Sequence, residues 1–120
     1  KEFIVWSGND SDTFSLICMG GYGIISVASH LVGNQIKKMI ELCVKGKTGE
    51  AAIIHRRLLP LVNALFVIPN PMPIKYALNY IGFNVGKPRL PLTEPDDKSK
   101  LLIEETLKSY SIDLPLPKKK

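Results

Sequence analysis

Cysteine is scarce in this sequence: Cys18 and Cys43 are the only two among 120 residues. They form no C-x-x-C motif and match no metal-ligand spacing, which argues against a thiolate metal site. Each lies on the apolar face of a predicted helix. We therefore interpret both as buried, reduced thiols of a cytoplasmic protein.

Several other features of membrane or nucleic-acid-binding proteins are absent. No uninterrupted apolar run approaches the roughly 20 residues of a membrane helix, and no basic-then-apolar signal segment opens the chain. No alternation of aromatic and basic residues suggests a platform for single-stranded nucleic acid. The net charge is +5, but Lys118, Lys119 and Lys120 supply three of those charges. We interpret this basic tail as a solvated end, and we predict neither a membrane nor a nucleic-acid partner.

What is present suits a globular α/β protein, with 45% apolar and 22% charged residues. Phe3 to Trp6 and residues 24–28 are apolar on both faces, which predicts two strands of a buried parallel sheet. Helical spacing predicts a helix over about 11–19, ended by Gly20-Gly21, and a second helix from about 36 to Gly46. The first 46 residues thus read β-α-β-α.

Helices alone are predicted for residues 47–120. The first spans about 48–67 and contains Pro60, which should kink it. A proline-rich break separates it from a helix that begins near Ile74. The last helix begins near Pro95-Asp96-Asp97, whose acids suit a helix N-terminus.

Two parallel strands cannot form a stable sheet alone, because both edges and both apolar faces stay open. An eight-stranded barrel takes about 250 residues, so two strands in 120 residues suit its closing quarter plus an appendix. The start at Lys1, with a strand-like run from Phe3, also predicts that the chain continues a longer one.

Four motifs carry a family resemblance. They are Ser7-Gly8-Asn9-Asp10, Gly23-Ile24-Ile25-Ser26-Val27, the segment Leu-Phe-Val-Ile-Pro-Asn-Pro-Met-Pro-Ile-Lys over residues 65–75, and Arg89-Leu90-Pro91-Leu92. Together, and in this spacing, they resemble the dihydrodipicolinate synthase family over nearly the whole chain. That family commonly has two aspartates where this chain has Asn9-Asp10, so Asn9 removes one charge.

The resemblance implies an α/β fold: the last two β/α units of a (β/α)₈ TIM barrel over residues 1–46, and a C-terminal three-helix domain over 47–120. The family's complete enzyme is a Schiff-base lyase that condenses pyruvate with aspartate semialdehyde in lysine biosynthesis. Its imine-forming lysine and proton relay would lie upstream of Lys1. The chain would therefore hold no catalytic residue and need no metal or cofactor.

What the chain keeps, by resemblance, is a wall of the substrate pocket. Gly8 matches a glycine beside the pyruvate adduct, and Ile25 matches an isoleucine whose backbone approaches pyruvate. Asn9 and Asp10 follow at the rim, so Gly8, Ile25, Asn9 and Asp10 are the candidate substrate-binding residues. The expected partners are the remaining barrel strands and further copies of the same protein.

Two other functions stay open. One is an N-acetylneuraminate lyase or keto-sugar-acid aldolase of the same superfamily. The other is a non-catalytic half-barrel module that completes a partner. The Ser26-Val27 and Pro69-Asn70-Pro71 motifs favour the synthase.

The remaining chemistry-bearing side chains receive structural interpretations. Lys75 follows three prolines in the first turn of a helix, and the family does not use it for the imine. His30 is expected in a loop and His55 on a solvated helix face. Asp10 and Asp12 are explained by helix capping more simply than by a metal.

Overall fold

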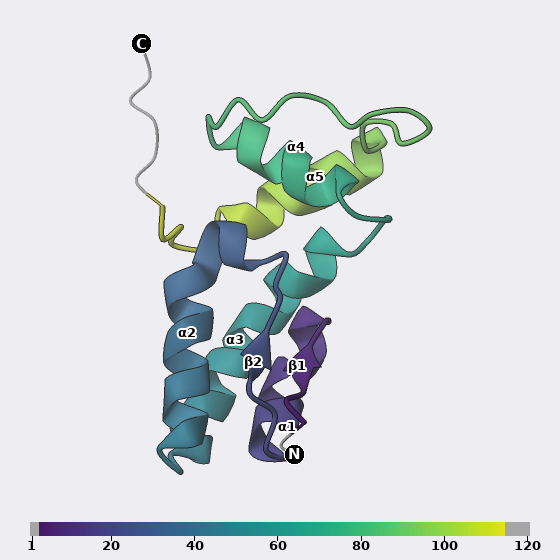
Figure 1. Ribbon diagram of the computed structural model, residues 1–120. Coiled ribbons are helices and arrows are strands. Elements are labelled where there is room, and N and C mark those ends of the chain that lie inside the picture. Colours follow the sequence, from purple (N-terminus) through teal and green to yellow (C-terminus); the bar gives the residue numbers. More distant parts are fainter. Residues whose placement is uncertain (1–2, 115–120) are drawn as a thin grey trace.

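The chain alternates two short strands with helices and then continues in helices alone (Figure 1). The computed structural model describes residues 3–114, so the basic tail lies outside the described residues. The first elements are strand β1 (Trp6–Ser7), 3-10 helix η1 (Asp10–Asp12), helix α1 (Thr13–Cys18), strand β2 (Gly23–Ile24) and helix α2 (Ser29–Val44). They are followed by α3 (Thr48–Leu65), α4 (Met72–Tyr80) and α5 (Asp97–Leu107).

The two strands pair in parallel, as predicted, with Trp6 opposite Gly23 and Ser7 opposite Ile24. Both are shorter than expected, and the prediction of strand structure up to Ala28 was wrong. A strand is extended by hydrogen-bonding neighbours, and the sheet of the described residues has only these two members. Large apolar side chains consequently stay exposed: Phe3, Ile4, Val5, Trp6 and Ile25.

Helix α1 ends at a pair of glycines, as the sequence indicates. Gly20 has a φ of +97°, a conformation that side chains with a Cβ rarely adopt. At Gly21 a Cβ would lie 2.8 Å from the Leu16 Cγ and 2.9 Å from the Leu16 carbonyl oxygen. The tight return from α1 into β2 therefore requires glycine.

Helix α2 begins earlier than predicted and is interrupted at Val32, whose φ of −131° is not helical. The second part of the helix gains its own cap from the far end of the chain. Asp113 Oδ2 accepts hydrogen bonds from the backbone N–H groups of Asn34 (2.7 Å) and Gln35 (3.1 Å). A carboxylate at a helix N-terminus satisfies otherwise unpaired donors. This contact ties the C-terminal segment to the helix that follows β2.

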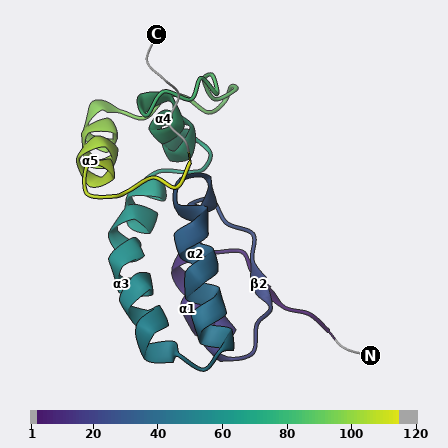
Figure 2. The same cartoon turned by 90° about the vertical axis from the view of Figure 1, so that its left-hand side faces the viewer.

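Helices α2 and α3 lie side by side, and α4 and α5 lie together at one end of this pair (Figures 1 and 2). Helix α3 includes Pro60 and continues to Leu65. The core gathers apolar side chains from α2, α3, α4 and α5, among them Leu31, Ile36, Leu58, Leu61, Leu65, Ala77 and Ile103. Helical spacing predicts an apolar stripe of Ile36, Met39, Ile40, Cys43 and Val44 on α2. Ile36 and Met39 are buried as predicted, whereas Val44 at the end of the helix is exposed.

Helix α5 begins where its acidic residues predict. Asp96 Oδ1 accepts the backbone N–H of Ser99 at 2.8 Å, which is an N-cap contact. Tyr76 of α4 donates its hydroxyl to Glu104 of α5. This bond, together with burial, raises the pKa of Tyr76 to about 12, so the phenol stays neutral and works as a link between two helices.

The prediction of two buried cysteines was wrong. Cys18, the last residue of α1, is exposed, and Cys43 is only half-buried. Burial, with a smaller contribution from the neighbouring Cys18 thiol, raises the pKa of Cys43 to about 11.

His55 was predicted on a solvated face, and this was also wrong. Its ring is half-buried and stacks on Phe14 of α1, with 5.1 Å between ring centroids. Burial, followed by the positive charge of Arg56, lowers the pKa of His55 below its usual range. The folded protein therefore favours the neutral imidazole.

We expect this preference to make stability depend on pH. An unfolded histidine titrates at about 6.5. The contribution of neutral His55 to the free energy of unfolding is therefore complete above that pH and is lost as the pH falls below it. The free energy of unfolding should decrease more between pH 7.5 and 5.5 in the parent protein than in His55→Gln, as measured by urea titration. Equal decreases would mean that Phe14 and Arg56 do not affect the protonation of His55.

Candidate functional site

Parallel pairing brings the carboxyl ends of β1 and β2 to the same edge of the sheet, where barrels of this type place their sites. Gly8 and Asn9 follow β1, and Ile25 follows β2. The Ile25 N–H donates to the Ser7 carbonyl at 3.0 Å, which continues the ladder one step beyond β2. The structure therefore brings together the two chain segments that the sequence assigns to a pocket wall.

These segments face open space within the described residues. The Ile25 side chain is 77% exposed. A Cβ placed on Gly8 would meet nothing within 4 Å. Asn9 is exposed at the rim, and its side-chain amide donates to Asp12 Oδ2 at 2.9 Å. Gly8, Asn9 and Ile25 are thus free to contact a molecule or chain segment placed against this edge.

Asp10 differs from the other three candidates because its carboxylate is buried and already bonded. It is 7% exposed. Oδ1 accepts the Ser26 hydroxyl, and Oδ2 accepts the backbone N–H groups of Val27 (2.9 Å) and Ala28 (3.3 Å). Neither Asp10 nor Asp12 caps η1 or α1, so the helix-capping expectation was wrong there. The Asp10 carboxylate accepts the N–H groups that directly precede α2, and Asp12 accepts the Asn9 amide and the Ser11 hydroxyl.

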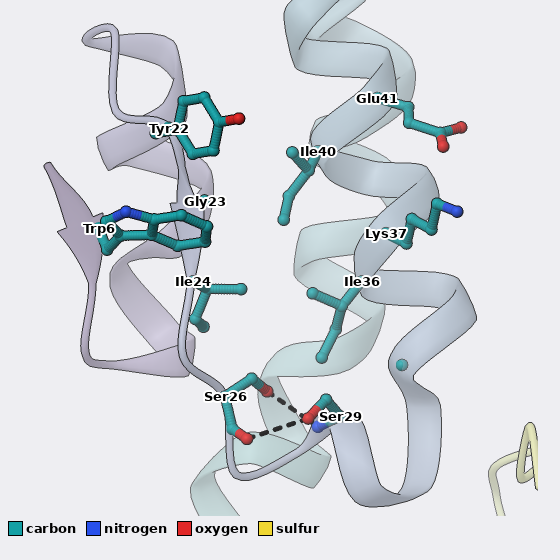
Figure 3. Close-up of a pocket in the computed structure, with 11 residues that line it drawn as sticks. Trp6, Tyr22, Gly23, Ile24, Ser26, Ser29, Ile36, Lys37, Ile40 and Glu41 are labelled. Atoms are coloured by element: carbon teal, nitrogen blue, oxygen red, sulfur yellow. Dashed lines mark hydrogen bonds between the residues drawn. The ribbon is translucent and has the colours of Figure 1, made fainter. Parts of the chain in front are cut away.

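Ser26 is the residue that sequence reasoning missed here. Its hydroxyl donates to Asp10 and accepts the Ser29 N–H at 2.8 Å, while the Ser29 hydroxyl donates to the Ser26 carbonyl at 3.0 Å (Figure 3). A single hydroxyl residue inside the apolar run from Ile24 to Ala28 was the available signal. A partly buried hydroxyl among apolar residues needs a polar partner.

A separate cavity of about 400 Å³ lies between the strands and α2 (Figure 3). It is mainly apolar, and of the candidate residues and their direct partners only Ser26 lines it; its walls include Trp6, Tyr22, Ile24, Ile36 and Ile40. Lys37 and Glu41 of α2 are its charged members. The apolar lining suits a packing surface between strand and helix layers better than an acid–base site.

The side chains at the strand ends hold no free nucleophile. The Ser7 hydroxyl donates to the Asn9 carbonyl at 2.8 Å. Lys75 lies in α4, where its Nζ donates to the Lys87 carbonyl at 2.8 Å. His30 lies in the first turn of α2, not in a loop, and its Nδ1 lies 2.9 Å from the Val27 carbonyl oxygen. Within residues 3–114 no cluster of three or more potential ligands suits a metal ion.

A parallel β-α-β-α unit with its polar turns at one sheet edge is typical of α/β enzymes, both barrels and doubly wound folds. Residues 1–110 match the model of the dihydrodipicolinate synthetase family, and the chain belongs to this family of TIM-barrel lyases. Among the part of the chain that the structure describes, no helix has both the length and the apolarity of a membrane span.

Named relatives agree with this assignment. The chain is 64% identical over 115 residues to a 4-hydroxy-tetrahydrodipicolinate synthase of Dehalococcoides mccartyi, which covers 96% of this chain and 39% of that protein. It is 48% identical over 112 residues to the synthase of Heliobacterium modesticaldum, covering 93% and 37%. The chain thus spans about two fifths of the length of these relatives.

Solved structures carry the likeness to the fold. The dihydrodipicolinate synthase of Aquifex aeolicus superposes with a TM-score of 0.88 at 36% identity, covering 97% of this chain and 39% of that one. The enzyme of Thermotoga maritima gives 0.85 at 43% identity, covering 88% and 36%. The two strands and five α-helices described here therefore have the arrangement of the matching part of those enzymes.

Proposed function

We propose that this chain forms the last two β/α units, residues 1–46, and the C-terminal helical domain, residues 47–120, of a 4-hydroxy-tetrahydrodipicolinate synthase. The complete cytoplasmic enzyme condenses pyruvate with aspartate semialdehyde through an imine on a barrel lysine, in the pathway to lysine. The observation that carries the proposal is the 64% identity over 115 residues to a named synthase.

The open sheet supports the same conclusion. The described chain has one parallel strand pair, and the apolar residues Phe3, Ile4, Val5 and Ile25 beside it are exposed. Burial of such side chains is worth about 25 cal/mol per Å². The barrel strands that the family places before this segment are the natural cover, because they would pair with the open edges and bury these side chains together.

Within that barrel the chain supplies a wall of the pyruvate pocket and no catalytic residue. Gly8 offers space beside the adduct, since no described atom approaches within 4 Å of a Cβ built there. Ile25 presents its backbone at the neighbouring strand end. Asn9 lies at the rim, where the aldehyde would enter. Asp10 is buried behind it and hydrogen-bonds the segment that follows Ile25.

The test uses the full-length protein, meaning this chain together with the barrel strands that the family places before it. With pyruvate, we expect turnover of aspartate semialdehyde at least about a hundredfold above that of N-acetylneuraminate and of keto-sugar acids, because buried polar groups built for one substrate discriminate strongly against others. Turnover of N-acetylneuraminate instead would assign the protein to the lyase branch. Absence of turnover with every substrate would leave the non-catalytic half-barrel module.

A further inference from the structure

Asp10 is a buried carboxylate that no cation neutralises among the described residues. Its side chain takes part in none of their ion pairs, although it is almost fully enclosed. A buried charge is costly unless hydrogen bonds replace its water. The Ser26 hydroxyl and two backbone N–H groups do so, and the positive end of α2 adds to them.

The segment that carries Asp10 is held rigidly from the other side. Thr13, which is fully buried, donates its hydroxyl to the Asn9 carbonyl at 3.1 Å, and Ser7 donates to the same carbonyl at 2.8 Å. The turn after β1 is therefore fixed to α1. Asp10 then extends from this fixed base across to the turn after β2.

The turn after β2 is held in place by hydrogen bonds to Asp10 more than by hydrogen bonds to β1. Beyond Ile24, only the Ile25 N–H continues the ladder. Val27 and Ala28 direct their N–H groups to Asp10, and Ser26 joins Asp10 to Ser29. One carboxylate therefore holds the Ser26 side chain and the two backbone N–H groups that follow it.

We propose that Asp10 is a positioning residue, not a substrate ligand: it holds the Ser26–Ala28 segment, which directly follows Ile25, against the turn after β1, and so sets the distance between Ile25 and Gly8 at the pyruvate pocket. This inference rests on the proposed function. By resemblance, this chain's part of the pyruvate pocket is Gly8 and the backbone of Ile25, and a displacement of about 1 Å in such a site costs on the order of a hundredfold in rate. The aldehyde would enter at the rim, away from the buried carboxylate.

The kinetic test compares Asp10→Asn with Asp97→Asn in the full-length protein. The two changes remove the same charge, but Asp97 lies in the exposed first turn of α5. In Asp10→Asn, one accepting oxygen is replaced by an NH2 group that can only donate. This group must face either the Ser26 hydroxyl, which donates to Asp10, or the backbone N–H groups of Val27 and Ala28. We expect kcat/KM for pyruvate to fall by about tenfold to a hundredfold, with KM for aspartate semialdehyde within about twofold. Asp97→Asn should match the parent enzyme.

A matched pair at Ser26 tests the same contact from its other end. Ser26→Ala removes a donor to Asp10 and should raise KM for pyruvate, whereas Ser26→Thr keeps the hydroxyl and should restore it. In the double variant Asp10→Asn with Ser26→Ala the two losses should not add, because they break one contact. A rise in KM for the aldehyde alone would make Asp10 a substrate ligand. A lower melting temperature with unchanged kinetics would make it a purely structural residue.

Amide hydrogen exchange separates this inference from the proposed function. Asp10→Asn should speed exchange at Val27 and Ala28 by about tenfold, whether or not the protein is active, while Asp97→Asn should not. If the parent protein turns over no pyruvate but Asp10→Asn still speeds exchange at these amides, the proposed function fails and the positioning role of Asp10 stands. Unchanged exchange at both amides in Asp10→Asn would overturn the positioning role itself.

Discussion

Residues 1–120 on their own are expected to form no adduct with pyruvate that borohydride can reduce. Imine formation needs an amine placed at the pyruvate pocket. By resemblance, that amine belongs to a barrel strand before this chain, and the strand ends described here hold Gly8, Asn9 and Ile25 instead. Lys75 lies in α4 and donates its Nζ to the Lys87 carbonyl. Intact-mass spectrometry after treatment with pyruvate and borohydride should show an unmodified chain.

The matched control is the full-length protein, which should gain one reduced pyruvyl group per chain under the same conditions. A mixture of residues 1–120 with a separately produced piece carrying the other barrel strands should regain the adduct on that piece, because each would bury the other's open edge. The variant Lys75→Ala should leave all three results unchanged. A stoichiometric adduct on Lys75 would contradict the assignment of catalysis to the rest of the barrel.

Helices could be predicted more fully than strands because their hydrogen bonds are local. Helices α2 and α3 bury the side chains that recur at helical spacing, such as Ile36, Leu58 and Leu61. Strand length depends on neighbours, and the run from Ile24 to Ala28 looks like a strand although only Gly23 and Ile24 pair. Composition shows that such a run is apolar. It cannot show that the N–H groups of Val27 and Ala28 donate to Asp10 instead of to the carbonyl groups of a neighbouring strand.

The sequence indicates which residues lie at the strand ends but not the contacts that these residues make. Gly8 and Ile25 are named by the family resemblance, and the structure places both residues at the carboxyl ends of the paired strands. The bond between Asp10 and Ser26 joins residues 16 apart, and that between Gln35 and Asp113 joins residues 78 apart. No short-range spacing encodes either. Both are fixed only when packing brings the turn after β2 and the C-terminal segment to the two halves of α2.

The largest loss of stability should come from truncating the centre of the helical core, at Leu61. Its side chain is 1% exposed and packs in the cluster that joins α2, α3, α4 and α5. Leu61→Ala removes apolar contacts and leaves a cavity in this cluster, at a cost of about 2–5 kcal/mol in the free energy of unfolding. Urea titration of the protein measures this loss.

Leu101→Ala makes the same truncation on the exposed side of α5, where Leu101 is 59% exposed, and should change stability by less than about 0.5 kcal/mol. Equal losses in the two variants would show that the cluster around Leu61 does not hold these helices together. Since α3 carries both this core and the face that packs on α1 and α2, a loss at Leu61 should also increase hydrogen exchange in the helix that follows β2.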